Sequence, residues 1–266
     1  ININFTMIEP KIVGIIPGRM ASTRFPNKML YPIFNYPMIE HVRRRAMLSE
    51  LVDEIYVTTC DDLIADMVKN AGGKVIMTSD QHLNATTRIA EAVKNIDCSH
   101  VILLLGDEPL ILPNHIDSMA KSIITNPKVN AWKAVGPLDS VDSISDSSVV
   151  KCVLGSEEQI LYCFRKSPSI APPKQQITFI KKLLGASAFR KEFLLKLESF
   201  PIGFGEKYDS IEELRVLENG FKLNSVVFKE SLPSVNEVKD LDKLYEYVEE
   251  YQIQKTILKQ IFDCKF

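Results

Sequence analysis

Three cationic side chains follow the first apolar segment of this chain, close enough to one another to bind a single polyanion. They are Arg19, Arg24 and Lys28. Pro17 and Gly18 precede them, end the apolar segment and allow the backbone to turn sharply. Guanidinium and ammonium groups, together with the backbone N–H groups of such a turn, suit the phosphates of a nucleotide. The alternative is a solvated basic loop, the more common fate of cations at this spacing.

A carboxylate follows a later apolar segment. Residues 101–105 lead into Gly106 and Asp107. Ligands of open α/β sheets collect at the carboxyl ends of strands, so Asp107 is expected to reach a Mg²⁺ ion bound to phosphates. The alternative is an ordinary turn fixed by Pro109. Cations and a hard oxygen ligand are the two parts that phosphoryl chemistry needs, so we expect Lys28 and Asp107 to lie close together.

The elements that must position these residues alternate between apolar strands and amphipathic helices. After the first strand we expect strands at 54–59, 74–78 and 101–105, and helices at 37–49, 61–71, 86–95 and 113–124. This alternation predicts an α/β fold with a Rossmann-like, mostly parallel sheet and helices on both faces. Asp61 is expected to cap the second helix and Gly72 to end it. Neither G-x-x-x-x-G-K-[ST] nor G-x-G-x-x-G occurs in the first loop, so a P-loop NTPase and a typical dinucleotide fold are not supported.

From Ala131 onward the pattern is richer in strands. We expect a smaller β-rich part with a hairpin at 149–154 and 159–164, a helix at 209–219, a strand at 223–228 and one long helix from about 238 to 261. Three prolines in residues 167–176 exclude regular structure there, and this segment is expected to be a substrate-facing loop.

Composition restricts the partners. The 266 residues carry a net charge of -2, which gives no reason to expect nucleic acid or a membrane as partner. The five cysteines are scattered without C-x-x-C pairing, which favours a cytoplasmic location. No apolar run reaches membrane-spanning length, and residues 1–7 lack the features of a secretory signal.

The motifs taken together resemble the CMP-Kdo synthetases (3-deoxy-manno-octulosonate cytidylyltransferases). The resemblance covers most of residues 12–245 in family order. It is carried by IIPGRMASTRFPNK at 15–28, PMIEHV at 37–42, AGG at 71–73, TTR at 86–88, GDEP at 106–109, VK at 150–151, YCFR at 162–165 and EELR at 212–215.

The resemblance implies a single nucleotidyltransferase domain over residues 1–266, with a nucleotide-binding half at 12–136 and a sugar-binding and dimerisation part at 137–266. The implied reaction couples CTP to the anomeric hydroxyl of a 2-keto-3-deoxy sugar acid and releases pyrophosphate, with Mg²⁺ as cofactor and a homodimer as the assembly. It implies in-line attack of the sugar oxygen on the α-phosphorus without a covalent enzyme intermediate.

The resemblance also implies roles for individual residues. Catalysis falls to Lys28, Arg19 and Asp107, and the metal ligands are Asp107 and Asn236. The nucleotide site comprises Pro17, Gly18, Arg19, Ser22, Arg24, Lys28 and Gly106. The sugar site comprises Arg88, Leu105, Arg165, Ser187 and Glu212.

Three of the charged sites have simpler alternatives. A bidentate guanidinium at Arg88 suits the carboxylate of a sugar acid, but a surface charge in the first helical turn explains it equally well. Glu212 could instead be a helix-surface carboxylate paired with Arg215. The run Arg43-Arg44-Arg45 is expected to be a solvated helix face or a subunit edge.

Departures from the family pattern gather on the sugar side. Leu105 replaces a glutamine, Leu183 a histidine, Ser187 a tyrosine and Ala85 a glycine. An unpaired buried hydroxyl costs ~1–3 kcal/mol, so the acceptor could be a relative of Kdo such as an amino-Kdo or a nonulosonate. Asn236 replaces an aspartate and weakens the expected metal site unless Glu237 or Asp240 compensates, which leaves a non-catalytic nucleotide-binding protein as a further alternative.

Overall fold

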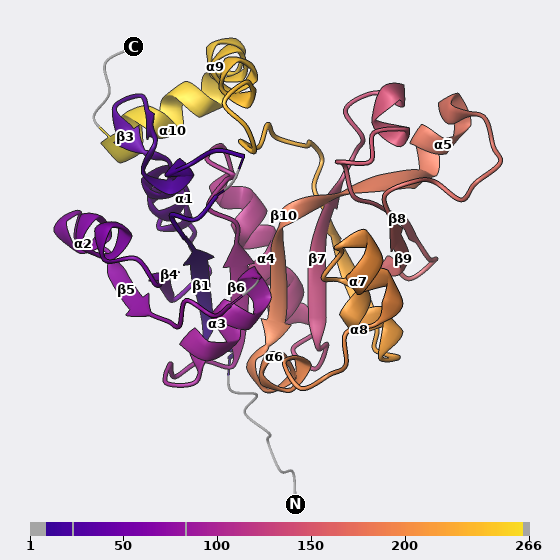
Figure 1. Cartoon of the computed structure of the whole chain (residues 1–266), viewed down its shortest axis with the longest axis horizontal. Coiled ribbons are helices and arrows are strands. Elements are labelled where there is room, and N and C mark those ends of the chain that lie inside the picture. The colour runs from indigo at the N-terminus through magenta and orange to yellow at the C-terminus, as the bar shows by residue number, and fades with distance from the viewer. Residues whose placement is uncertain (1–8, 23, 83, 263–266) are drawn as a thin grey trace, which may run out of the picture.

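A nine-stranded mixed sheet forms the centre of the molecule (Figure 1). The structure is a computed structural model that describes residues 9–22, 24–82 and 84–262. The strand order is β5-β4-β1-β6-β10-β7-β11-β9-β8. These strands are β1 Ile12–Pro17, β4 Glu54–Thr59, β5 Lys74–Met77, β6 His100–Leu104, β7 Ala131–Gly136, β8 Lys151–Leu154, β9 Gln159–Phe164, β10 Ile180–Arg190 and β11 Leu223–Val227. A separate two-stranded ribbon pairs β2, Pro32–Ile33, with β3, Tyr36–Pro37.

Strand direction divides the sheet into two parts. The strands β5, β4, β1 and β6 are parallel, as expected from the βαβα alternation. The strand β10 then runs antiparallel to both β6 and β7, and β8 and β9 form the predicted antiparallel hairpin at the outer edge. The α/β class and the β-rich outer part are therefore confirmed.

Helices cover both faces of the sheet. They are α1 Met38–Ala46, α2 Asp62–Asn70, α3 Ala85–Val93, α4 Pro113–Thr125, α5 Pro173–Phe179, α6 Lys191–Leu197, α7 Phe204–Asp209, α8 Leu214–Glu218, α9 Asp240–Glu250 and α10 Gln252–Phe262, with short 3₁₀ turns at Lys28–Leu30 and Val141–Ile144. Alternate residues of β1 point to opposite faces. Ile12 and Ile16 pack with α1, α2 and α4, whereas Val13 and Ile15 pack with α3, α6 and α8.

A third apolar cluster joins the segment after β1 to the C-terminal helices. The helices α9 and α10, drawn in yellow, lie beside β3 and α1 (Figure 1). The Tyr36 ring stacks on Phe262 at 3.8 Å, and the Arg44 guanidinium donates to the Ile261 carbonyl at 2.8 Å. The segment that connects β11 to these helices passes the carboxyl ends of β1 and β6, where Val235 contacts Lys28 and Asp107.

Several sequence-based expectations about elements were wrong. The expected long helix over 238–261 is two helices that meet at Tyr251, which has extended backbone angles. The expected helix at 209–219 begins later, because Ser210 ends α7 in a left-handed conformation with φ of 54°. The segment 167–176 contains the start of α5, since Pro173 is tolerated in the first turn of a helix.

Two expectations about side chains were also wrong. Asp61 precedes α2 but makes no capping bond to it; its carboxylate accepts from the backbone N–H of Met20 at 2.8 Å instead. Arg43 and Arg45 are buried rather than solvated. Arg43 Nε lies 2.6 Å from Glu40 in the same helix, so neither residue forms a basic surface.

No helix among the described residues is long and apolar enough to cross a membrane.

Candidate active site

Close backbone packing shapes the first loop. The Gly18 N–H donates to Thr58 O at 2.9 Å, and a Cβ at Gly18 would lie 2.7 Å from the Ile39 side chain. A Cβ at Gly106 would lie 2.7 Å from the Met29 sulfur and 3.3 Å from the Pro17 carbonyl. Gly18 therefore lets the first loop pack against α1, and Gly106 lets the end of β6 approach the end of β1. The loops after the two strands therefore form one surface.

Lys28 and Asp107 meet on this surface, as the sequence predicts. Lys28 Nζ lies 2.7 Å from Asp107 Oδ2 and donates to the Val235 carbonyl at 3.1 Å. The Val235 N–H in turn donates to the Asp107 carbonyl at 2.9 Å. Lys28 is 8% exposed. The connector after β11 thus fixes both charged residues, and the third N–H of the ammonium is left for a ligand.

All of the predicted site residues line two adjoining cavities. The smaller, of about 470 Å³, is lined by the whole predicted nucleotide set and by Arg88. The larger, of about 960 Å³, is lined by Arg165 and Ser187. Both cavities share Arg24, Ala85, Leu105, Asp107, Glu212 and Asn236. The arrangement can hold a polyanion on one side and a second molecule on the other.

Arg88 is not the surface charge that its position in the first helical turn suggested. It is 3% exposed, and its Nη1 donates to Thr78 Oγ1 at 2.7 Å and to the Ser79 carbonyl at 3.1 Å. These bonds fix the segment after β5 against α3. Arg88 lines the smaller cavity but not the larger one. Its predicted contact with a sugar carboxylate stays a prediction.

Glu212 is not paired with Arg215. Arg215 forms an ion pair with Glu206, whereas the Glu212 carboxylate accepts from Thr86 Oγ1 at 2.6 Å. Burial raises the pKa of Glu212 above its usual range, although the Thr86 hydrogen bond opposes this shift. The carboxylate therefore bridges the start of α3 and the segment before α8, and it faces both cavities.

The outer wall of the larger cavity is held by Arg165. Its Nη1 donates to Ser147 O at 3.0 Å, and its Nη2 donates to Ser210 O at 3.1 Å. The guanidinium therefore joins the segment before β8 to the end of α7. Its predicted contact with the substrate stays a prediction.

An ion pair in the same wall was not predicted from the sequence. Lys133 Nζ lies 2.6 Å from Glu213 Oε1 and 3.2 Å from Ser187 Oγ. Burial opposes ionisation of Glu213, but the charge of Lys133, its hydrogen bond and smaller contributions together hold the pKa of Glu213 below its usual range. A charged lysine in the middle of a buried strand was the one sequence signal that could have drawn attention to it.

Glu108 was missed as well. A Cβ at Gly185 would lie 2.4 Å from Glu108 Cγ, so the glycine of β10 makes room for this side chain. Burial, and next the charge of Asp107, raises the pKa of Glu108 to about 8.

The residues beside Asp107 suit a Mg²⁺ ion held partly by a ligand's phosphates. No cluster of three or more His, Cys, Asp or Glu side chains capable of holding a metal exists in the described part of the chain. Asn236 Nδ2 donates to Ser234 Oγ at 3.3 Å, which leaves the amide oxygen for a cation. Asp240 instead accepts from the backbone N–H groups of Asn236 and Glu237, each at 2.8 Å. One carboxylate and one amide oxygen fit an ion that keeps water and phosphate oxygens as its other ligands.

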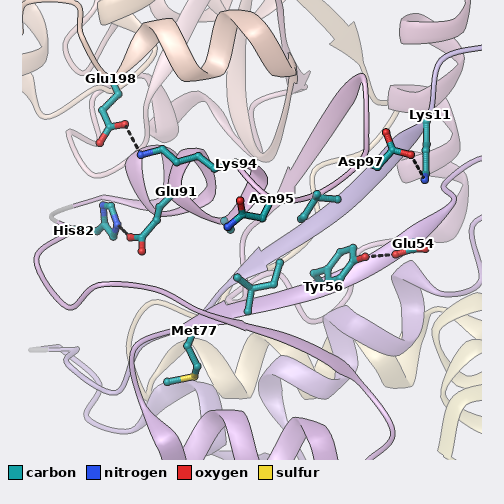
Figure 2. Close-up of a pocket in the computed structure, with 13 residues that line it drawn as sticks. Lys11, Glu54, Tyr56, Met77, His82, Glu91, Lys94, Asn95, Asp97 and Glu198 are labelled. Atoms are coloured by element: carbon teal, nitrogen blue, oxygen red, sulfur yellow. Dashed lines mark hydrogen bonds and ion pairs between the residues drawn. The ribbon is translucent and has the colours of Figure 1, made fainter.

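A separate cavity of about 750 Å³ lies between the start of β4 and the end of α3 (Figure 2). Its charged side chains bond to one another: Lys11 to Asp97 at 2.9 Å, Lys94 to Glu198 at 3.9 Å, Tyr56 to Glu54, and His82 to Glu91. This mutual pairing leaves no charged group directed at a ligand among the side chains drawn in Figure 2.

A cationic loop after β1 and a carboxylate after the adjacent β6, at the edge of a substrate-sized cavity, define a nucleotidyltransferase. Residues 13–231 match the model of the cytidylyltransferase family. The chain belongs to this family.

Curated relatives support the assignment. The chain is 35% identical to a 3-deoxy-manno-octulosonate cytidylyltransferase of Geobacter metallireducens, over 91% of this chain and 100% of the relative. It is also 35% identical to an 8-amino-3,8-dideoxy-manno-octulosonate cytidylyltransferase of Shewanella frigidimarina, over 88% of this chain and 96% of the relative.

Solved structures agree with this fold. The structure of CMP:2-keto-3-deoxy-manno-octonic acid synthetase complexed with CTP superposes with a TM-score of 0.84 at 29% identity, over 90% of this chain and 99% of that one. An inositol-1-phosphate CTP transferase of T. maritima shares the fold, with a TM-score of 0.68 at 15% identity over 96% of this chain and 99% of that one.

Proposed function

We propose that this protein transfers CMP from CTP to a 2-keto-3-deoxy sugar acid and releases pyrophosphate, with Kdo as the first acceptor to test. The observation that carries the proposal is the 2.7 Å pair of Lys28 and Asp107 at the junction of two cavities. The smaller cavity offers the cationic loop to a triphosphate, and the larger offers polar side chains to a sugar. The relatives' acceptors, Kdo and its 8-amino relative, support this substrate class.

The mechanism follows from what these residues can do. Arg19 and Arg24, which are exposed in the first loop, bind and orient the phosphates by charge-assisted hydrogen bonds. Lys28, already fixed by Asp107, stabilises the negative charge that develops as the acceptor oxygen attacks the α-phosphorus and pyrophosphate leaves. Asp107 and Asn236 would hold Mg²⁺, which supplies further neutralisation of phosphate charge when bound.

Pyrophosphate release tests the proposal. Purified protein is assayed with CTP, Mg²⁺ and, separately, Kdo, 8-amino-Kdo and a nonulosonate. Release with Kdo supports the first acceptor, and release only with another acid moves the acceptor to that compound. CTP binding in calorimetry without turnover on any acid would contradict the catalytic proposal.

We propose a homodimer as the assembly. Large apolar side chains are exposed on β9, on α5 and just before it, and on α7 and just before it: Leu161, Tyr162, Ile170, Phe179, Ile202, Phe204 and Tyr208. Such surface often marks an interface. Sedimentation that gives the mass of one chain at all concentrations tested would contradict this proposal.

We also propose that the protein works in the cytoplasm. Cys60, Cys98, Cys152 and Cys163 are free thiols, the form that a reducing compartment maintains. The fifth cysteine, Cys264, lies outside the described residues. Fractionation of cells that express the full protein tests this location.

A further inference from the structure

The ion pair of Lys133 and Glu213 lies in the wall of the larger cavity and does not line the smaller one. Lys133 comes from the middle of β7, Glu213 immediately precedes α8, and Ser187 lies opposite Lys133 in the β10–β7 pairing. The Lys133 side chain is 8% exposed and that of Glu213 is 20% exposed. Three separate elements therefore place an ammonium and a carboxylate at one buried point of the cavity.

The interior beside this pair is apolar. Cys152 and Cys163 are fully buried, lie opposite each other in the β8–β9 strand pairing and do not line the cavity. Burial, and next the charge of Glu213, raises the pKa of Cys152 to about 12. Glu213 and Ser187 account for two of the three donors of the Lys133 ammonium. The third N–H of the Lys133 ammonium is therefore available to a molecule bound in the cavity.

Stability alone does not explain such a pair. Removing two charges from water costs several kcal/mol, and apolar side chains of similar volume are often as stable or more stable. Lys133, Glu213 and Ser187 all line the larger cavity, so the pair lies where it can contact a bound molecule.

We propose that Lys133 is a specificity-determining residue that donates a hydrogen bond to a hydroxyl group of the acceptor, while Glu213 accepts the hydrogen of the same hydroxyl. The proposal rests on the function proposed above. A hydroxyl can both accept from an ammonium and donate to a carboxylate, so it matches the pair. A carboxylate of the acceptor does not, because Glu212 and Glu213 are both beside it and would repel it.

The variant Lys133→Met tests the assignment, because methionine has a side chain of similar length but lacks the N–H donors of the ammonium. Kdo is the acceptor used, and KM, kcat and the calorimetric affinity for CTP are measured. A lost hydrogen bond to a charged donor predicts a KM for Kdo about ten- to a hundredfold higher, with unchanged CTP affinity. If this variant does not fold, the pair variant Lys133→Met with Glu213→Gln removes the charges together and has the same expected effect.

A buried pair outside the cavity provides the matched control. Glu206 and Arg215 form an ion pair with side chains that are each 8% exposed, and neither lines the cavity. Glu206→Gln is expected to lower the melting temperature without changing the KM for Kdo. A purely structural role for Lys133 would make the two variants behave alike, and that result would overturn the proposal.

Kdo derivatives that each lack one hydroxyl complete the test. Wild-type protein should bind the derivative that lacks the hydroxyl bound by Lys133 more weakly than it binds Kdo. The Lys133→Met variant should bind this derivative and Kdo with equal affinity. Equal losses in both proteins for every derivative would overturn the assignment. Wild-type protein that binds CTP but does not use Kdo would instead refute the proposed acceptor, and the assignment of Lys133 would fall with it.

Discussion

The 2.7 Å contact between Lys28 and Asp107 brings together two residues of opposite charge that the proposed reaction needs for different purposes. Each holds the other in place, and the Val235 backbone holds both. The ammonium is therefore oriented before any ligand binds, which is how a site stabilises developing charge without reorganising.

Replacing either member of this pair should abolish turnover. Lys28→Ala removes the charge nearest the proposed transition state, and Asp107→Ala removes the proposed metal ligand. We expect each variant to reduce kcat by about three orders of magnitude or more. Pyrophosphate release measures the loss, and circular dichroism checks that the fold is retained. A variant with near-normal kcat would contradict the proposed mechanism.

A substitution at Asn236 is expected to strengthen Mg²⁺ binding rather than to weaken it. Asn236 lines the smaller cavity together with Asp107, and Asn236→Asp adds a charge that attracts a divalent cation. We expect the Mg²⁺ concentration that gives half-maximal activity to fall in this variant. A titration that superposes on that of the wild-type protein would show that Asn236 is not a metal ligand.

These residues differ in how far the sequence could predict them. Lys28 and Asp107 each end a recognisable strand–loop unit, and parallel strands bring their carboxyl ends together, so their contact was predictable. The contact of Lys133 with Glu213 was not, since it requires the segment before α8 to reach β7, which the sheet places between β10 and β11. Sequence periodicity does not specify that strand order.

The helix α1 shows how packing can contradict an interpretation based on sequence, here that its three arginines form a solvated face. Arg43 reaches Glu40 and the Ala71 carbonyl, which ties α1 to the end of α2. Arg45 is fully buried, donates to the Ile111 carbonyl at 3.4 Å and leaves Nε and Nη2 without a hydrogen-bond partner in the described residues. Burial lowers its pKa to about 9. A run of three arginines looks solvated in sequence, and only packing shows which of them are buried.

The two buried arginines should differ in their contribution to stability. Arg43→Met leaves the buried Glu40 carboxylate with a weaker set of partners and is expected to cost about 3 kcal/mol of unfolding free energy. Arg45→Met removes an unpaired buried charge and is expected to cost less than about 1 kcal/mol, or to stabilise the protein. Denaturant unfolding of both variants measures the difference. A larger loss for Arg45→Met than for Arg43→Met would show that this guanidinium has a partner the described contacts do not include.

Element boundaries were predictable where local signals were strong. The hairpin around residues 155–158 and the end of α2 before Gly72 match the expectations. The break at Tyr251 was not predictable, because the apolar periodicity of 238–261 continues through it on both sides. Packing of α10 against α1, rather than local propensity, decides that the chain turns there.

For the whole molecule, the important feature is that the segment from Phe25 to α1 and the C-terminal helices meet at one apolar cluster. The connector before α9 carries Val235 and Asn236 to the site, and α9 and α10 then anchor it against α1 and the β2–β3 ribbon. Loosening this cluster would therefore release a wall of the nucleotide cavity. The active site depends on a contact between the first and last fifths of the chain.

His41 makes that contact sensitive to acid. The imidazole lies in α1, its Nε2 is 2.8 Å from the Ile33 carbonyl, and its ring packs against Phe262 at 4.6 Å. Burial lowers the pKa of His41 to about 4 from an ordinary value of 6.5. Because the folded protein resists protonation, the unfolded state binds more protons below pH 6.5. The stability is therefore complete above pH 6.5 and is lost as the pH falls toward 4.

This loss can be measured against a variant that does not titrate. Between pH 7 and about pH 4.5 the His41 contribution should reduce the unfolding free energy by about 2–3 kcal/mol. His41→Gln keeps a side-chain donor toward Ile33 but has no proton to gain. The unfolding free energy of this variant should therefore fall less than that of the wild-type protein over the same pH range, and the difference should equal the His41 contribution. Urea unfolding of both proteins at matched pH values gives the difference, to which His100 and His115 contribute equally in each. Parallel pH profiles for the two proteins would show that protonation of His41 at the contact of α1 with α10 does not cause the loss of stability at low pH.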